Sequence, residues 1–344
     1  MSKEVHTPIH PEKNEVMRNP NDAEVSLSDD ELLRCYHYMC LTRAVEEAIV
    51  RLYRQGKILG GAYTGRGNEA TSVGSAFCLE REDYLFPLHR DLGAHMVKGQ
   101  SVRNVMLQHL GRGNSLTRGR DGTGHYADPS LRIYGNISHL AAMIPIAAGV
   151  ALAGKLRKEK IVVMTYIGDG GSNVGDFHES LAMSSVMKLP LVLIVENNQF
   201  AYSTPVSKQF VAEHLSDRAV GYGIPGVLVD GTDVEKVYAA SKRAVERARA
   251  GHGPTLIESV TMRMEGHSAH DSAEYVPSGL LDEWQKKDPV LNIEKRLAGR
   301  RLLTAEAKTT AEEKIAAEIN DAIQFALESP YPPAESAGIG VFAE

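Results

Sequence analysis

Apolar residues follow two alternating patterns in the second half of the chain. Over residues 174–188, and again from about 233 to 249, they recur at the spacing of an amphipathic helix. Four other segments are short, largely β-branched apolar runs, typical of parallel strands buried on both faces: residues 161–167, 191–196, 226–231 and 255–262. This alternation predicts an α/β fold, a doubly wound, mostly parallel sheet with helices on both faces.

Helical patterns are also expected on either side of this alternation. Ser28, followed by Asp29, Asp30 and Glu31, has the composition of a helix start, and apolar residues continue at helical spacing to about Gln55. We interpret this segment as a packing or subunit-interface helix. Residues 280–328 are charged and amphipathic, which predicts further helix.

The same patterns divide the chain into three parts. We expect a flexible N-terminal arm over residues 1–26, an α/β domain over 27–279 and a helical C-terminal tail over 280–344. Two glycine-rich segments, 60–67 and 111–124, are expected to be surface loops.

Composition narrows the class of protein. The 344 residues are 43% hydrophobic and 24% charged, a balance that favours a folded globular chain over a disordered one. The net charge of −6 argues against nucleic acid as a partner, since nucleic-acid binders need a basic face. The longest apolar stretch, Leu140 to Gly154, is 15 residues and contains Pro145, too short to cross a membrane.

The cysteines and the polar N-terminus indicate a cytoplasmic location. Cys35, Cys40 and Cys78 are odd in number and lack CxxC spacing, so we expect reduced thiols rather than a disulfide framework. The first 24 residues carry both charge signs and no apolar core, unlike a secretory signal or a transit peptide.

Candidate chemistry lies just past two of the expected strands. Gly168, Asp169 and Gly170 follow one strand, and the pair Asn197 and Asn198 follows the next. Because parallel strands end at the same edge of a sheet, these residues should face one another. A carboxylate and an amide oxygen suit Mg²⁺ or Ca²⁺, and glycines before a helix start allow the backbone to approach an anion. The pattern predicts a metal-diphosphate site.

The GDG and NN pairs, with 26 residues between them, resemble the motif of thiamine-diphosphate enzymes. The chain more closely resembles the alpha subunit of the decarboxylating first component of 2-oxo acid dehydrogenase complexes, the pyruvate and branched-chain family. The likeness extends from about Leu27 to Leu327. It includes these stretches: residues 88–101, 135–154, 168–190, 196–207, 223–234 and 262–275.

The resemblance implies a role for individual residues. Asp169, Asn198 and the main-chain carbonyl of Phe200 would bind Mg²⁺, and His267 would also be a catalytic candidate. Tyr202 would stand near the cofactor ring, and Glu196 would be an outer candidate. The implied thiamine-diphosphate contacts are His89, Arg90, Ser138, Leu140, Gly168, Asp169, Gly170, Gly171, Asn198, Phe200 and His267.

Part of the active site is expected to come from another chain. Thiamine chemistry needs a glutamate that acts on the aminopyrimidine, and no further strand-helix unit is present to supply it. In the resembled family a beta subunit with a pyrimidine domain provides it, in an α2β2 heterotetramer. The implied reaction is oxidative decarboxylation of a 2-oxo acid, with reductive acylation of a lipoyl group on an acyltransferase core. Pyruvate is the first choice of substrate, and branched 2-oxo acids and acetoin are alternatives.

Other readings stay open at this point. His267, His270 and Asp271 could form a transition-metal site. Asp169 could serve a Mg²⁺-dependent phosphohydrolase, or the chain could be a noncatalytic scaffold. His125 is either near the active-site entrance or a solvated loop residue. Modification of Ser268 is left open, because some relatives are phosphorylated at that place.

Overall fold

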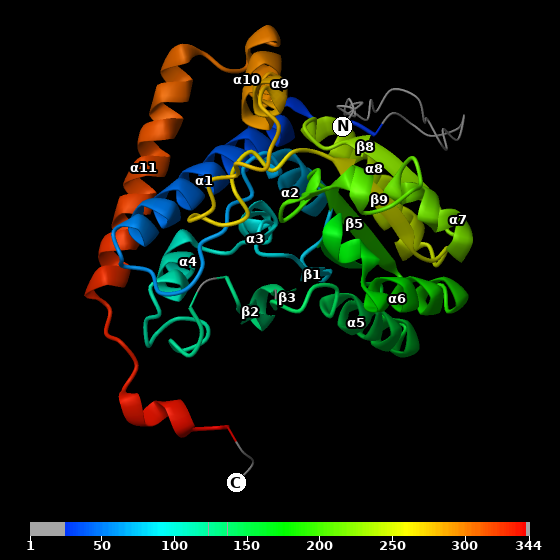
Figure 1. The fold of residues 1–344 in the computed structure, drawn as a ribbon, viewed down its shortest axis with the longest axis horizontal. Helices are drawn as coiled ribbons and strands as arrows, with labels where there is room; N and C mark the ends of the chain where they lie inside the picture. The colour runs from blue at the N-terminus through cyan, green and yellow to red at the C-terminus, as the bar shows by residue number, and fades with distance from the viewer. Residues whose placement is uncertain (1–24, 123, 136, 342–344) are drawn as a thin grey trace, which may run out of the picture.

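The computed structural model describes residues 25–122, 124–135 and 137–341. The arm expected over residues 1–26 therefore lies almost wholly outside the described residues. The seven-stranded sheet has the order β2-β3-β1-β4-β5-β9-β8, and its strands are parallel except for the β2–β3 pair (Figure 1). Its strands are β1 (Tyr84–Phe86), β2 (Ala127–Asp128), β3 (Ile133–Tyr134), β4 (Val163–Gly168), β5 (Leu191–Asn197), β8 (Gly226–Asp230) and β9 (Thr255–Val260). The expected α/β class and the four expected strands β4, β5, β8 and β9 are confirmed.

Alternate residues of the central strands supply two separate cores. In β5, Val192 and Ile194 face the core formed with α2 (Glu69–Ala76) and α8 (Val234–Arg249). Leu193 and Val195 face the opposite core with α6 (Gly175–Val186) and α5 (Met143–Arg157). Because a strand alternates its side chains between faces, one continuous apolar run serves both helix layers. Figure 1 shows α5 and α6 side by side below the sheet.

The first expected helix is α1 (Asp29–Arg54), and its start has the predicted chemistry. The Ser28 side chain accepts a hydrogen bond from the Glu31 N–H, and the Glu31 carboxylate accepts from the Ser28 N–H, a capping box. Together these contacts satisfy N–H groups that a helix start leaves without partners.

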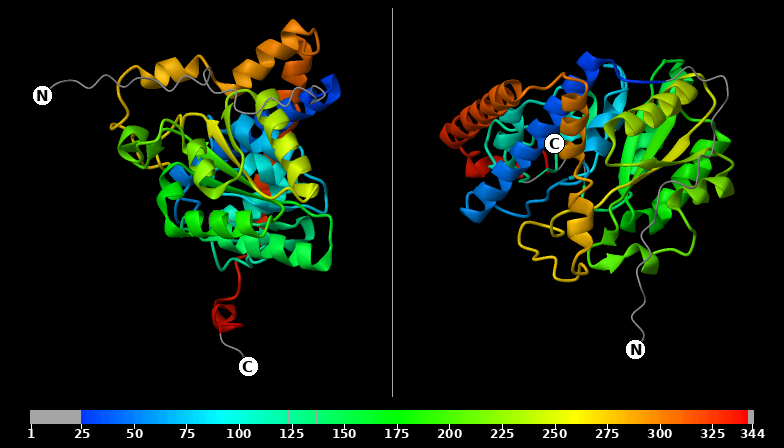
Figure 2. Two further views of the ribbon diagram at one scale, coloured as in Figure 1. Left: turned by 90° about the vertical axis from the view of Figure 1, so that its right-hand side faces the viewer. Right: turned by 90° about the horizontal axis from the view of Figure 1, so that it is seen from above.

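The C-terminal helices are part of the packed molecule. They are α9 (Leu280–Gln285), α10 (Pro289–Gly299) and α11 (Ala305–Glu328). Ile315 and Ile319 of α11 are buried with residues of α1 and of α4 (Val102–His109). Figures 1 and 2 show α11 lying alongside α1. The segment expected to be a helical tail is therefore helical, and α11 completes a core with N-terminal helices.

The expectation of a surface loop is wrong for the second half of residues 60–67. Thr64, Gly65 and Gly67 are buried, because this segment packs directly against two other backbones. A Cβ atom added to Gly65 would lie 2.1 Å from the Arg90 carbonyl oxygen. One added to Gly67, whose φ is +100°, would lie 2.0 Å from the Met262 carbonyl oxygen. Because they have no side chains, these glycines allow separate backbone segments to approach closely at the site described below.

We therefore expect Gly65→Ala to lower the free energy of unfolding by about 2 kcal/mol, because its methyl group would displace main-chain atoms. Chemical denaturation of the purified protein measures the change. Gly149→Ala in α5 is the matched control, since an added Cβ there has no neighbour within 4 Å. Equal stabilities of the two variants would contradict the close packing at Gly65.

No helix within the described part of the chain is long and apolar enough to cross a membrane.

Candidate active site at the strand ends

Strands β4 and β5 bring the two motif residues together. Gly168 pairs with Glu196 in the parallel register, so Asp169 and Asn198 leave the sheet at the same edge. The carbonyl oxygen of Glu196 accepts hydrogen bonds from the N–H groups of Asp169, at 3.2 Å, and Asn198, at 2.9 Å. A single backbone oxygen thus ties the GDG turn to the NN turn.

Asp169 is a buried carboxyl group, with 1% of its surface exposed. Burial raises the pKa of Asp169 to about 6, although the amide of Gln209 favours the charged form by donating to Oδ2 at 2.6 Å. A bound cation would stabilise this carboxylate, which water reaches poorly. The residue therefore fits the chemistry of a metal ligand.

The carbonyl of Phe200 lies in the hairpin formed by β6 (Phe200–Ala201) and β7 (Thr204–Pro205). Arg263, which is buried, donates to the Phe200 carbonyl oxygen at 3.2 Å and to the Tyr202 carbonyl oxygen at 2.7 Å. The guanidinium therefore fixes the direction of both carbonyl groups. Because a carbonyl oxygen has two lone pairs, that of Phe200 can accept from Arg263 and also face a cation.

Packing requires glycine at two positions of this turn, Gly170 against the hairpin and Gly171 against Ile167 of β4. A Cβ atom on Gly170 would lie 2.4 Å from the Ala201 Cβ, and one on Gly171 would lie 2.5 Å from the Ile167 Cδ1. Gly168, in contrast, has open space where a Cβ would point. The turn can therefore come close to the hairpin and keep room beside Asp169.

Arg90 joins two loops near the strand ends. Its guanidinium donates to the Thr64 carbonyl oxygen at 2.7 Å and to the His267 carbonyl oxygen at 2.6 Å. Burial lowers the pKa of Arg90 to about 10, so the group stays charged at neutral pH. Arg90 and His267, both expected to contact phosphate, are thus direct neighbours.

His267 is surrounded by aromatic rings and cations. Its ring centre lies 4.6 Å from that of Tyr202, and its backbone N–H donates to the Asp271 carboxylate at 2.6 Å. Burial, followed by the charges of Arg90 and Arg263, lowers the pKa of His267 to about 4. The imidazole is therefore neutral at physiological pH and able to accept a proton.

An NMR titration of the histidine side chains should show this shift. We expect the His267 signal, assigned with a His267→Gln variant, to stay constant from pH 8 to about 5 and to change near 4. Because the pKa in the folded chain lies below the ordinary value of about 6.5, protonation of His267 disfavours the folded site as pH falls. A midpoint near 6.5 would show instead that the ring is solvated.

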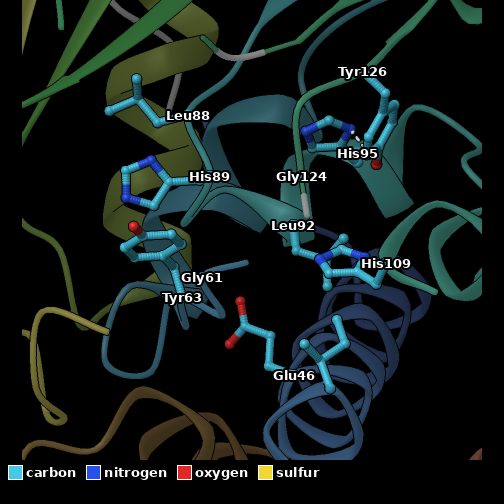
Figure 3. Close-up of a pocket in the computed structure, with 11 residues that line it drawn as sticks. Glu46, Gly61, Tyr63, Leu88, His89, Leu92, His95, His109, Gly124 and Tyr126 are labelled. Carbon is cyan, nitrogen blue, oxygen red and sulfur yellow. Dashed lines mark hydrogen bonds between the residues drawn. The ribbon is translucent and has the colours of Figure 1, made fainter. Parts of the chain in front are cut away.

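His89 borders a small polar cavity of about 30 Å³. Its ring centre lies 4.7 Å from that of Tyr63, and burial lowers its pKa well below the ordinary value. Figure 3 shows the His89 and Tyr63 rings beside each other and Glu46 across the cavity. In another wall, the Tyr126 hydroxyl and His95 Nδ1 are hydrogen-bonded at 3.0 Å. His89 thus contacts Tyr63. The Tyr63 ring also lies near His267, with 5.7 Å between the two ring centres.

Ser138 and Leu140 lie on the exposed side of the site. The Leu140 Cβ is 3.5 Å from the position that a Gly171 Cβ would take, so Leu140 stands beside the GDG turn with 46% of its surface exposed. The Ser138 hydroxyl is hydrogen-bonded to His125 Nε2 at 3.0 Å.

The alternative transition-metal site is not supported. His270 is hydrogen-bonded to Ser268 at 3.1 Å through Nδ1, and the Asp271 carboxylate is occupied by the His267 N–H and the Tyr275 hydroxyl. Over the ranges that the structure describes, no three His, Cys, Asp or Glu residues are grouped to hold a metal ion. The set expected to bind Mg²⁺ is different, because it consists of an aspartate, an asparagine and a main-chain carbonyl, and only the aspartate is of these four residue types.

Sequence reasoning missed two residues that organise this site. Gln209 contacts the Asp169 carboxylate, and Arg263 holds the Phe200 carbonyl. Neither belongs to a spacing motif. Arg263 lies in the stretch 262–275 that carries the family resemblance, and its charge soon after the apolar run of β9 was a second signal.

Comparison with known proteins assigns the sequence to a family. Residues 36–335 match the model of the family described as dehydrogenase E1 component. The chain is 39% identical, over 93% of its length and 98% of the relative's, to the 2-oxoisovalerate dehydrogenase subunit alpha of Bacillus subtilis. It is 35% identical to the pyruvate dehydrogenase E1 component subunit alpha of Rhizobium meliloti, over 90% of this chain and 89% of the relative. The pyruvate dehydrogenase E1 component subunit alpha of Staphylococcus aureus is 37% identical, over 89% of this chain and 80% of the relative.

The chain therefore belongs to the dehydrogenase E1 component family, which depends on thiamine diphosphate. Its place in that family is as the alpha subunit of the first component of a 2-oxo acid dehydrogenase complex, an oxidoreductase. This confirms the resemblance seen in the sequence and argues against the phosphohydrolase and scaffold readings. An alpha subunit implies a beta subunit and a complex with an acyltransferase core.

Proposed function

We propose that Asp169, Asn198 and the carbonyl of Phe200 hold Mg²⁺, which binds the diphosphate of thiamine diphosphate. The observation that carries this proposal is the buried Asp169 carboxyl, tied through the Glu196 carbonyl to the Asn198 turn. Three oxygen ligands from the protein leave positions for phosphate oxygens, as is usual for Mg²⁺ sites. Arg263 keeps the Phe200 carbonyl in a fixed direction.

The remaining expected residues surround the same turn. Arg90 and His267 would contact phosphate oxygens, with the glycine turn of Gly168, Gly170 and Gly171 alongside. Arg90 is charged and buried, which strengthens its attraction for an anion. Ser138 and Leu140 would meet the aminopyrimidine end of the cofactor. His89, which was also expected to contact the cofactor, would act on it indirectly through Tyr63.

When bound, the cofactor supplies the nucleophilic carbon and the electron sink for the loss of CO₂ from a 2-oxo acid. In this chain, His267 is the proposed proton-transfer residue, because its ring lies beside Arg90 and Tyr202 at the expected cofactor site. The Tyr202 ring lies edge-on to that of His267, and we propose that it limits the substrate to a small 2-oxo acid such as pyruvate. The 39% identity to a 2-oxoisovalerate dehydrogenase subunit makes branched 2-oxo acids the second candidate.

An apolar surface near the site favours the expectation that a beta subunit binds there. We infer one apolar patch from exposed side chains on α5, on α6 and in the residues flanking these helices, among which Val186 is 84% exposed. Such a patch is typical of a protein interface. We propose that it receives the beta subunit of an α2β2 heterotetramer, which brings the catalytic glutamate close to Leu140. The patch residues are Leu140, Ile146, Met183, Val186 and Met187.

Two further parts of the proposal concern the surroundings of the enzyme. The lipoyl group of an acyltransferase core would accept the acyl unit after decarboxylation. We also propose a cytoplasmic location, which the free thiols of Cys35, Cys40 and Cys78 support.

Co-expression with the presumptive beta subunit tests the proposed function. Decarboxylation of pyruvate, branched 2-oxo acids and acetoin would be followed with an artificial electron acceptor, with and without Mg²⁺. We expect activity only with both subunits and the metal, and the highest kcat/KM for pyruvate. Activity of the alpha chain alone, or equal activity after complete removal of divalent ions, would refute it.

A further inference from the structure

A short hairpin brings His125 to the cofactor side of the molecule. Strands β2 and β3 pair antiparallel, with Ala127 opposite Tyr134. Continuing this register places Tyr126 opposite Gly135, and a Cβ atom on Gly135 would lie 1.9 Å from the Tyr126 carbonyl oxygen. His125, the residue before Tyr126, is thus directed to the segment after Gly135, which contains Ser138.

Three side chains are aligned across these segments. The Ser138 hydroxyl oxygen and His125 Nε2 are 3.0 Å apart, and His125 Nδ1 and the Asp121 carboxylate are 3.3 Å apart. Asp121 is itself fixed through its backbone, because its carbonyl oxygen accepts from Gln108 Nε2 at 2.8 Å and from the Thr117 hydroxyl at 3.0 Å. The Asp121 carboxylate is therefore held within ion-pair distance of the His125 ring.

Proton positions follow from this alignment. The Asp121 carboxylate, 3.3 Å from His125 Nδ1, favours the neutral tautomer that has its proton on Nδ1. His125 Nε2 then carries a lone pair, and the Ser138 hydroxyl must donate to it. The remaining lone pairs of the Ser138 oxygen are directed to solvent or to a ligand, so Ser138 serves as an acceptor for a ligand N–H group.

We propose that His125 and Asp121 are positioning residues that fix the Ser138 hydroxyl as an acceptor for the amino group of the bound aminopyrimidine. This inference rests on the proposed function, in which Ser138 meets that ring. It assigns a role to His125, whose ring lies between the Asp121 carboxylate and the Ser138 hydroxyl.

Cofactor affinity in the reconstituted α2β2 complex with Mg²⁺ tests the relay, measured by titration calorimetry without substrate. We expect His125→Ala and Ser138→Ala each to weaken thiamine-diphosphate binding about fivefold, the worth of one neutral hydrogen bond. The double variant should be no weaker than either single one, because both lose the same contact. His125→Gln, whose side-chain oxygen can replace Nε2 as acceptor, should recover part of the affinity.

An analogue separates this role from a general loosening of the site. Oxythiamine diphosphate lacks the amino group, so its affinity should be equal in wild type, His125→Ala and Ser138→Ala. His252→Ala, at an exposed residue beyond α8, is the control and should bind both compounds as the wild type does. Each variant's melting temperature checks that it is folded.

The outcomes separate the two proposals. Wild-type affinity in His125→Ala, multiplied losses in the double variant, or equal weakening of the analogue would overturn the relay while leaving the proposed function intact. Failure of the wild-type complex to bind thiamine diphosphate would overturn both.

Discussion

Asp169→Ala should weaken Mg²⁺-dependent binding of thiamine diphosphate by on the order of 100-fold or more, since a buried ion loses its charged partner. The expected loss arises from one carboxylate that is 1% exposed at the strand edge. Titration calorimetry of the reconstituted complex, with and without Mg²⁺, measures it. Wild-type affinity in the variant would refute the metal assignment.

Removing the charge of Asp169 should not unfold the chain. Burial raises the folded-state pKa of Asp169 to about 6, above its unfolded value, so its ionisation makes the folded state less stable as pH rises. Without ligands at pH 7.5, Asp169→Asn should therefore unfold at a temperature no lower than wild type. Asp282→Asn, at an exposed residue of α9, is the control for loss of a negative charge and should leave cofactor affinity unchanged.

Arg263→Met should be the most destabilising of the substitutions considered, with a loss of about 3 kcal/mol in the free energy of unfolding. Arg263 is buried and donates to Phe200 and Tyr202 carbonyl oxygens and to the Tyr275 hydroxyl. The hydroxyl of Tyr275 in turn donates to Asp271, which holds the His267 N–H. Losing the guanidinium removes hydrogen bonds from acceptors that are buried or partly buried.

Two comparison variants show whether the contacts or the charge of Arg263 matter. Arg263→Lys keeps the charge but cannot span the carbonyl groups, so cofactor affinity should fall by more than about tenfold. Arg300→Met removes an arginine whose ion pairs with Asp29 and Glu235 are partly exposed, and should cost less than about 1 kcal/mol. Denaturation curves and cofactor titrations measure both effects, and equal destabilisation by Arg263→Met and Arg300→Met would contradict the proposed network.

The central part of the fold could be predicted because its strands are long and continuous. Runs such as residues 191–195 have no polar position on either face, which few structures other than a buried parallel strand allow. Once β4 and β5 were expected, the general behaviour of parallel strands placed Asp169 and Asn198 at one edge. The register of Gly168 with Glu196 agrees with that expectation.

Other elements carry too little local pattern. The strands β2 and β3 have two residues each and β1 has three, shorter than a period of alternation can reveal. The contact between His125 and Ser138 depends on that hairpin and was therefore not expected. The burial of Gly65 follows from contact with the Arg90 backbone, a long-range packing feature that no residue spacing encodes.

The most direct test of the metal assignment is a crystal structure of the αβ complex grown with thiamine diphosphate and Mn²⁺ in place of Mg²⁺. Anomalous scattering locates the ion without reference to the protein coordinates. We predict one peak per alpha subunit, roughly 2.1 Å from an Asp169 oxygen, the Asn198 amide oxygen and the Phe200 carbonyl oxygen. A cofactor bound with its ion on other residues, or with no ion, would contradict the account.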